Sequence, residues 1–89
     1  MAYHAYDEIK RKLQRKEEFR GNTMWARWEV PIKSNVDTYI VYSYATPIAW
    51  WNPGMDKPLV NLGKYSRTTS YHQNLVKAHL HHGEYEEKD

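Results

Sequence analysis

The segment Lys64–Gln73 gathers side chains that could bind or react within one short connection. It combines hydroxyl groups with an imidazole, an amide and two cations, and it precedes an expected helix. Free N–H groups and the helix dipole at such a position favour an anion, for example a phosphate or a carboxylate. Capping the helix is the more common role of Ser and Thr there, but capping explains neither His72 nor Gln73. The candidate binding residues of this segment are Lys64, Tyr65, Ser66, Arg67, Thr68, Thr69, His72 and Gln73.

Nucleophilic catalysis would require a Ser or Thr, a His and an acid in contact. Ser43, Ser66 and His72 could meet, with Asp37 or Asp56 orienting the imidazole, but no spacing singles out this set. The sequence also lacks a glycine-rich phosphate loop, a paired-carboxylate motif and a nucleophile elbow. We therefore expect no enzymatic activity and keep a small phosphate-handling enzyme centred on His72 as the third hypothesis.

A cluster of His79, His81 and His82, with His72 seven residues earlier, has the composition of a chelating patch. Metal sites usually draw further ligands from a second element, and this chain has no Cys to supply one. A His-rich helix end is more often a solvated surface. We therefore predict neither a metal site nor a cofactor.

The aromatic content is high for a short chain, with eight Tyr and four Trp in 89 residues. A domain of this size has a small core, so some of these large side chains are expected on a binding face. Tyr and Trp are enriched where proteins bind each other. The leading hypothesis is a non-enzymatic binding module for a protein partner, with five candidate anchors: Trp25, Tyr42, Tyr44, Trp50 and Trp51.

Charge is distributed unevenly, although the net charge is only +2. Cations of the N-terminal segment could bind phosphates while nearby rings stack on bases, which makes nucleic-acid binding the second hypothesis. Glu17 and Glu18 interrupt this segment, and a solvated helix face explains it more simply. The residues concerned are Lys10, Arg11, Lys12, Arg15 and Lys16.

Hydrophobic periodicity predicts an α+β fold, in which a small antiparallel sheet of three to four strands carries an N-terminal and a C-terminal helix on one face. Alternation places Trp25 with Arg27 and Glu29 on the outer face of the first strand, and Pro47 is expected to interrupt the ladder. The expected helices cover 3–20 and a segment from Tyr71 to Gly83, the latter capped by Thr68, Thr69 or Ser70. The expected strands cover 24–30, 38–45, 48–51 and 58–65.

Residues 1–83 are expected to form a single domain, followed by a frayed acidic tail over residues 84–89. Unprotected edge strands of so small a sheet would also allow a homodimer by strand pairing. No segment has the character of a signal peptide or a membrane span, and Cys is absent. We therefore expect a cytoplasmic protein that does not bind membranes.

Two motifs, YxVYSYxTxIA from Tyr39 and KYSxTTxxHQ from Lys64, occur in this order between residues 36 and 76. Together they resemble a small domain of unknown function found in proteins of bacteriophages and mobile elements. That family often has an aromatic residue or a His-Phe pair after the Thr of the first motif, where this chain has Pro47 and Ile48. The resemblance implies a phage accessory protein acting in the host cytoplasm, and it assigns no catalytic role to any residue.

Overall fold

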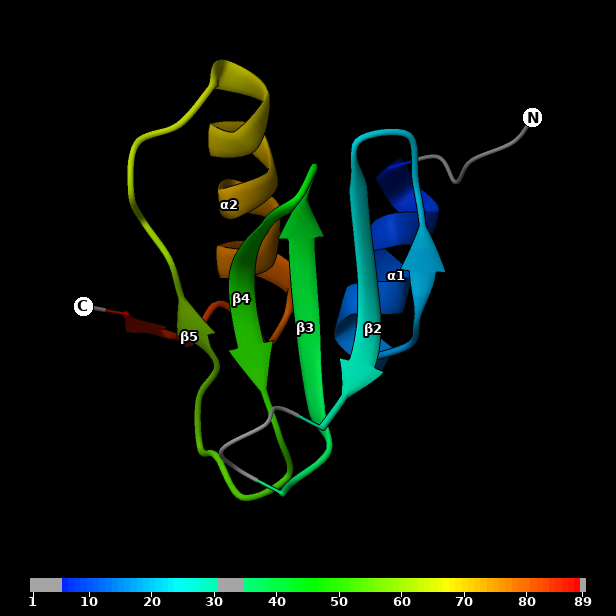
Figure 1. The fold of residues 1–89 in the computed structure, drawn as a ribbon, viewed down its shortest axis with the longest axis vertical. Helices are drawn as coiled ribbons and strands as arrows, with labels where there is room; N and C mark the ends of the chain where they lie inside the picture. Colours follow the sequence, from blue (N-terminus) through cyan, green and yellow to red (C-terminus); the bar gives the residue numbers. More distant parts are fainter. Residues whose placement is uncertain (1–5, 31–34, 89) are drawn as a thin grey trace.

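The structure, a computed structural model, describes residues 6–30 and 35–88 and has the expected α+β architecture (Figure 1). The described strands form one sheet in chain order, antiparallel throughout except for the last pair. In chain order, the elements are α1 (Tyr6–Arg15), β1 (Phe19–Arg20), β2 (Met24–Glu29), β3 (Thr38–Ser43), β4 (Thr46–Trp51), β5 (Leu59–Val60), α2 (Arg67–His79) and β6 (Glu86–Glu87).

Both helices lie on one face of the sheet, behind it in the view of Figure 1. The register pairs Met24 with Ser43, whose side chains point to the face that the helices cover. Every second residue along each strand points to the same face. Helix side chains pack on these positions and close a single core. The core contains Ile9, Leu13, Phe19, Met24, Ala26, Tyr39, Val41, Ile48, Ala49, Val60, Leu75, Val76 and Leu80.

The opposite face of the sheet, called the open face below, is covered by neither α1 nor α2 (Figure 1). Trp25 lies opposite Tyr42 there, and Trp50 lies between Ile40 and Leu59. The predicted position of Trp25 on the outer side of its strand is therefore confirmed. The open face is the part of the fold that can hold exposed aromatic side chains.

The first helix is shorter than predicted, because it ends at Arg15 instead of Arg20. Lys16 adopts a left-handed backbone conformation with φ of 53°, which ends a helix as a C-terminal cap does. The chain then turns before Gly21, and Phe19 becomes part of a two-residue strand opposite Ala26. The side chain of Phe19 is buried. This apolar residue, which was predicted to lie in the helix, therefore reaches the core from a strand.

Pro47 lies inside β4, opposite Tyr42, where an interruption of the ladder was expected. The register shifts between Val41 and Tyr42, which is the irregularity that lets a strand accommodate proline. Ile48, next in the chain, is fully buried. The predicted strand 38–45 thus ends at Ser43, and a tight turn leads directly into β4.

The C-terminal third departs most from expectation. Of the predicted strand 58–65, Leu59 and Val60 form ladder pairs with β4, and the backbone N–H of Asn61 adds one hydrogen bond to Ile48 O at 2.8 Å. Helix α2 starts at Arg67, four residues before the expected Tyr71, because Ser66 caps it.

The acidic tail also differs from the frayed segment that was expected. Glu86 and Glu87 pair in parallel with β5, so the sheet has six described strands, three of which contain only two residues. The backbone N–H of Glu86 donates to Pro58 O at 2.8 Å, and that of Lys88 donates to Val60 O at 2.8 Å. The tail satisfies groups that β5 would otherwise leave unpaired.

None of the helices within residues 6–30 and 35–88 is long and apolar enough to span a bilayer.

Candidate functional site

Four hydroxyl groups and one imidazole form a hydrogen-bonded chain between α2 and the sheet. Ser43 Oγ lies 2.7 Å from His72 Nδ1 and 2.9 Å from Thr69 Oγ1, which in turn lies 3.1 Å from Ser66 Oγ. His72 Nε2 lies 3.2 Å from Thr23 Oγ1. With a neutral imidazole protonated on Nε2, each group can donate to the next, so one tautomer satisfies the whole chain.

The middle of this network is buried, which decides what its Ser–His pair can do. Ser43 and His72 are both 0% exposed, and burial lowers the pKa of His72. The second ring nitrogen faces the Thr23 hydroxyl, so neither Asp37 nor Asp56 orients the imidazole. Ser43 and His72 do meet, as catalysis would require, but a substrate cannot reach them in this structure.

Gln73 has an equally structural role. Its Nε2 donates to Asn61 O at 2.7 Å and to Gly63 O at 2.9 Å, which holds the connection between β5 and α2 against the helix. Ser66 accepts from the backbone N–H of Thr69 at 3.1 Å and caps α2. Half of the candidate residues in this segment (Ser66, Thr69, His72 and Gln73) therefore stabilise the fold.

The other half of the segment faces solvent or lies near it. Lys64, Tyr65 and Arg67 are exposed, and Thr68 is half-buried. Tyr65 is fixed in place because its hydroxyl accepts a hydrogen bond from Asn61 Nδ2 at 2.9 Å. The predicted residues thus separate into an inner group that organises the helix and an outer group that remains available.

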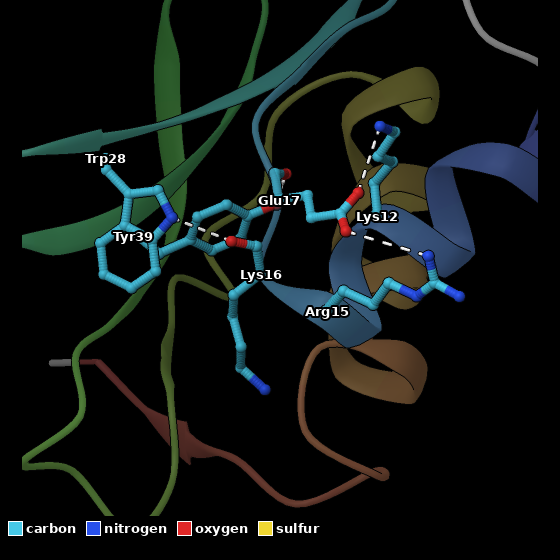
Figure 2. Close-up of polar contacts among 6 residues, drawn as sticks. All are labelled: Lys12, Arg15, Lys16, Glu17, Trp28 and Tyr39. Atoms are coloured by element: carbon cyan, nitrogen blue, oxygen red, sulfur yellow. Dashed lines mark hydrogen bonds and ion pairs between the residues drawn. The ribbon is translucent and has the colours of Figure 1, made fainter.

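The basic N-terminal segment is largely engaged within the molecule (Figure 2). Glu17 pairs with Lys12 at 3.2 Å and with Arg15 at 3.9 Å. Lys16 Nζ donates to Leu80 O at 2.7 Å, and burial lowers its pKa. Only two cations of the proposed nucleic-acid set, Lys10 and Arg11, have no such described contact.

The backbone at the end of α1 is also anchored to the sheet. Trp28 Nε1 donates to Lys16 O at 2.9 Å, and the Tyr39 hydroxyl donates to Glu17 O at 2.6 Å (Figure 2). Burial, with a smaller contribution from nearby Glu17 and Glu18, raises the pKa of Tyr39. This segment therefore fastens α1 to the sheet, a role that charge counting did not reveal.

The open face carries a stacked aromatic pair. The rings of Trp25 and Tyr42 lie 3.9 Å apart between centroids and 5° from parallel. Trp25 Nε1 donates to Tyr44 O at 2.7 Å, and the guanidinium groups of Arg27 and Arg20 lie 5.4 Å and 6.0 Å from the Trp25 ring. We call Trp25, Tyr42, Arg20 and Arg27 the stacked cluster.

A carboxylate fixes the stacked cluster from the side. The Tyr42 hydroxyl donates to Glu29, and Arg27 Nε contacts the same carboxylate at 2.9 Å. The hydrogen bond from Arg27, reinforced by that from Tyr42, lowers the pKa of Glu29. Burial and the neighbouring Glu29 raise the pKa of Tyr42. These contacts set the arrangement of Trp25, Tyr42 and Arg27 before any partner binds, whereas Arg20 only lies near the Trp25 ring.

Trp51 does not belong to this surface. It faces the helices, packs against the core, and meets Trp28 edge to face at 6.1 Å. Lys16 Nζ lies 4.8 Å from its ring, and its indole nitrogen is buried without a hydrogen-bond partner among the described residues. The prediction of Trp51 as a surface anchor is not supported, whereas Tyr44 is exposed in the turn after β3.

A hollow of about 370 Å³ opens at the β4 and β5 side of the sheet, beside the tail. Trp50 lies in its wall, with Lys88 Nζ 5.5 Å from the indole ring. We call it the Trp50 hollow; its lining is Thr46, Pro47, Trp50, Asn61, Tyr65 and Lys88.

Sequence reasoning missed several of these surface residues. Strand alternation already placed Arg27 beside Trp25, so that signal was present. No comparable signal existed for Lys88, because a tail without periodicity was expected to fray. Asn61 likewise gave no signal in the sequence, because its position is set by hydrogen bonds with Gln73 and Tyr65.

The histidine cluster forms no metal site within the described residues, where no three His, Cys, Asp or Glu side chains come together suitably. His81 instead lies with its ring 6.3 Å from that of Trp51 and its Nδ1 3.3 Å from Lys16 Nζ.

Comparison with known proteins places the chain in a family. Residues 8–89 match a protein family described as one of unknown function. No curated protein and no solved structure matches the chain.

Proposed function

The chain belongs to DUF8033, a family of unknown function, and we propose that it is a non-enzymatic module that binds a partner protein through the open face of its sheet. The stacked cluster carries this proposal. Trp, Tyr and Arg are the residue types that contribute most to protein interfaces, and here they lie side by side, outside the core and in fixed positions. An interface that is already ordered loses less conformational entropy on binding.

The packing of Trp25 favours a protein over a nucleic acid. One side of its ring is stacked on Tyr42, and two guanidinium groups lie near it, so less of the ring is free for a base. Base-stacking platforms need accessible ring faces together with a groove of positive charge. Here Glu29 pairs with Arg27, and three of the five cations proposed for nucleic acid contact groups elsewhere in the molecule.

The burial of Ser43 and His72 supports a non-enzymatic role. As the motif resemblance implies, we propose an accessory protein of phage type that acts in the host cytoplasm. Pairing of edge strands into a homodimer has less support, because both outer strands are two residues long and both carry charge.

The test is capture of partners from a bacterial lysate by the tagged protein, with and without nuclease. We expect a specific protein that survives nuclease and is lost with Arg20→Ser plus Arg27→Ser, which change only exposed side chains. Asn74→Ala, on the exposed side of α2, is the matched control and should retain the partner. If the arginine variant still captures the same partner protein, the proposal is wrong. Capture that requires nucleic acid and falls steeply with salt would favour the second hypothesis.

A further inference from the structure

The walls of the Trp50 hollow are fixed by Asn61 together with two residues of the second sequence motif, Tyr65 and Gln73. Asn61 Nδ2 donates to the Tyr65 hydroxyl and reaches Pro47 O at 3.4 Å, while Gln73 holds the backbone of Asn61. A Cβ on Gly63 would come within 3.3 Å of the Tyr65 ring, so this ring rests closely on the glycine. The hollow is therefore formed in advance, as binding sites for small groups usually are.

All the polar side chains that line the hollow can donate hydrogen bonds. Trp50 Nε1 and the Tyr65 hydroxyl hydrogen have no acceptor within residues 6–30 and 35–88, and Lys88 adds an ammonium group. Two of the acceptors are already engaged, because Asn61 Oδ1 accepts from Gly63 N at 2.9 Å and Pro47 O accepts from Asn61, whereas the Thr46 hydroxyl can both donate and accept. Such a wall favours a ligand that is rich in acceptors and poor in donors.

A proline-rich segment has this chemistry. Proline has no N–H, and the polyproline II conformation leaves every backbone carbonyl unpaired and exposed. Aromatic side chains, here Trp50 and Tyr65, are the surfaces on which such segments dock elsewhere. Lys88 has no carboxylate partner in the described part of the chain, so an acidic residue in the ligand would complement it.

We propose that the Trp50 hollow binds an extended, proline-rich segment bearing an acidic residue, contributed by the partner protein. This inference rests on the proposed function and names the chemistry of the partner. A polyanion fits less well than a segment with one acidic residue, because Lys88 is the single cation among the residues that line the hollow and the tail that carries it is otherwise acidic.

The test is a titration of the isotopically labelled full chain with a blocked oligoproline peptide containing one central glutamate, followed through the indole N–H signals. We expect a saturable shift of the Trp50 signal, while the signals of the core-facing Trp28 and Trp51 stay in place. A glycine- and serine-based peptide of equal length and charge should not bind. The absence of a saturable Trp50 shift, or equal binding of the flexible peptide, would overturn the proposal.

Variants separate the contributions of the lining. Tyr65→Phe removes one donor and should weaken binding about fivefold, the equivalent of one hydrogen bond. Lys88→Gln should weaken binding of the glutamate peptide but not of an all-proline peptide, and the exposed Lys57→Gln is its matched control. Equal effects of Lys88→Gln and Lys57→Gln would remove the acidic requirement and count against the proposal.

Failure here is distinguishable from failure of the proposed function. If lysate capture depends on Arg20 and Arg27 but no proline peptide binds, the open face still binds a protein and only this inference is wrong. If a single-stranded oligonucleotide shifts the Trp50 signal and the peptide does not, this inference is wrong, and nuclease-sensitive capture from the lysate would show that the proposed function is wrong as well.

Discussion

His72 makes the stability of the protein depend on pH. Burial lowers its pKa in the folded state, while the unfolded chain takes up a proton near the ordinary value of 6.5. Below that pH the unfolded state binds more protons, so the free energy of unfolding should decrease as the pH falls. The slope is at most about 1.4 kcal/mol per pH unit for one group. Urea unfolding between pH 7.5 and pH 5 measures it.

His72→Gln is the control for this titration, because an amide can replace part of the hydrogen bonding and cannot be protonated in this range. We expect this variant to be less stable at neutral pH and to lose most of the slope. If the stability of the wild-type protein stays constant across this window, the folded and unfolded states bind equal numbers of protons and the prediction is wrong.

Ser43 is the hydroxyl on which the buried network depends. Ser43→Ala leaves both His72 Nδ1 and Thr69 Oγ1 without this partner in a region closed to water. The cost of an unsatisfied buried group is about 1–3 kcal/mol, and we expect the free energy of unfolding to fall by that amount. Chemical denaturation checks it, with the exposed Ser70→Ala on α2 as control. Equal midpoints for the two variants would contradict the assigned network.

At the level of elements, Gln73 connects α2 to the strand that precedes it. Gln73→Glu keeps the size of the side chain but replaces the amide donor with an oxygen that faces Asn61 O and Gly63 O. We expect hydrogen exchange of residues 61–65 to accelerate, because the connection loses its attachment to the helix. If exchange increases uniformly over the whole chain, Gln73 supports global stability instead of this connection.

The longest elements were predictable from the sequence because each contains a full period of alternation or of helical spacing. Alternation correctly placed Trp25 and Arg27 on the outer face of β2. Strands β1, β5 and β6 contain two residues each, which is too short for any period to show. The cap at Ser66 was missed because three later hydroxyls had the same propensity, and only the contact with Thr69 distinguishes it.

The candidate site was predictable in residue type more than in arrangement. Surface aromatics were expected, but which rings are free depends on contacts between distant parts of the chain. Trp51 turns inward beside Lys16, whereas Trp50 turns outward beside Lys88. Neighbours in a strand point to opposite faces, and the sequence does not show which face the helices cover.

At the scale of the whole molecule, the tail completes the sheet and one wall of the Trp50 hollow. Removing residues 84–89 deletes two backbone hydrogen bonds to Pro58 and Val60, together with the packing of Tyr85 against the core. At about 1 kcal/mol for each hydrogen bond, we expect the truncated protein to lose roughly 2 kcal/mol of unfolding free energy or more. Chemical denaturation and amide exchange at Leu59 and Val60 measure the loss.

A charge-only variant separates strand pairing from electrostatics. Glu86→Gln plus Glu87→Gln keeps the backbone of β6 and removes two exposed negative charges, so its stability should stay close to that of the wild type. If the tail were frayed in solution, truncation would change neither stability nor exchange. Loss of stability in the truncated protein alone would mean that the last strand, with its backbone pairing and the packing of Tyr85, protects the edge of the sheet beside which the proposed ligand lies.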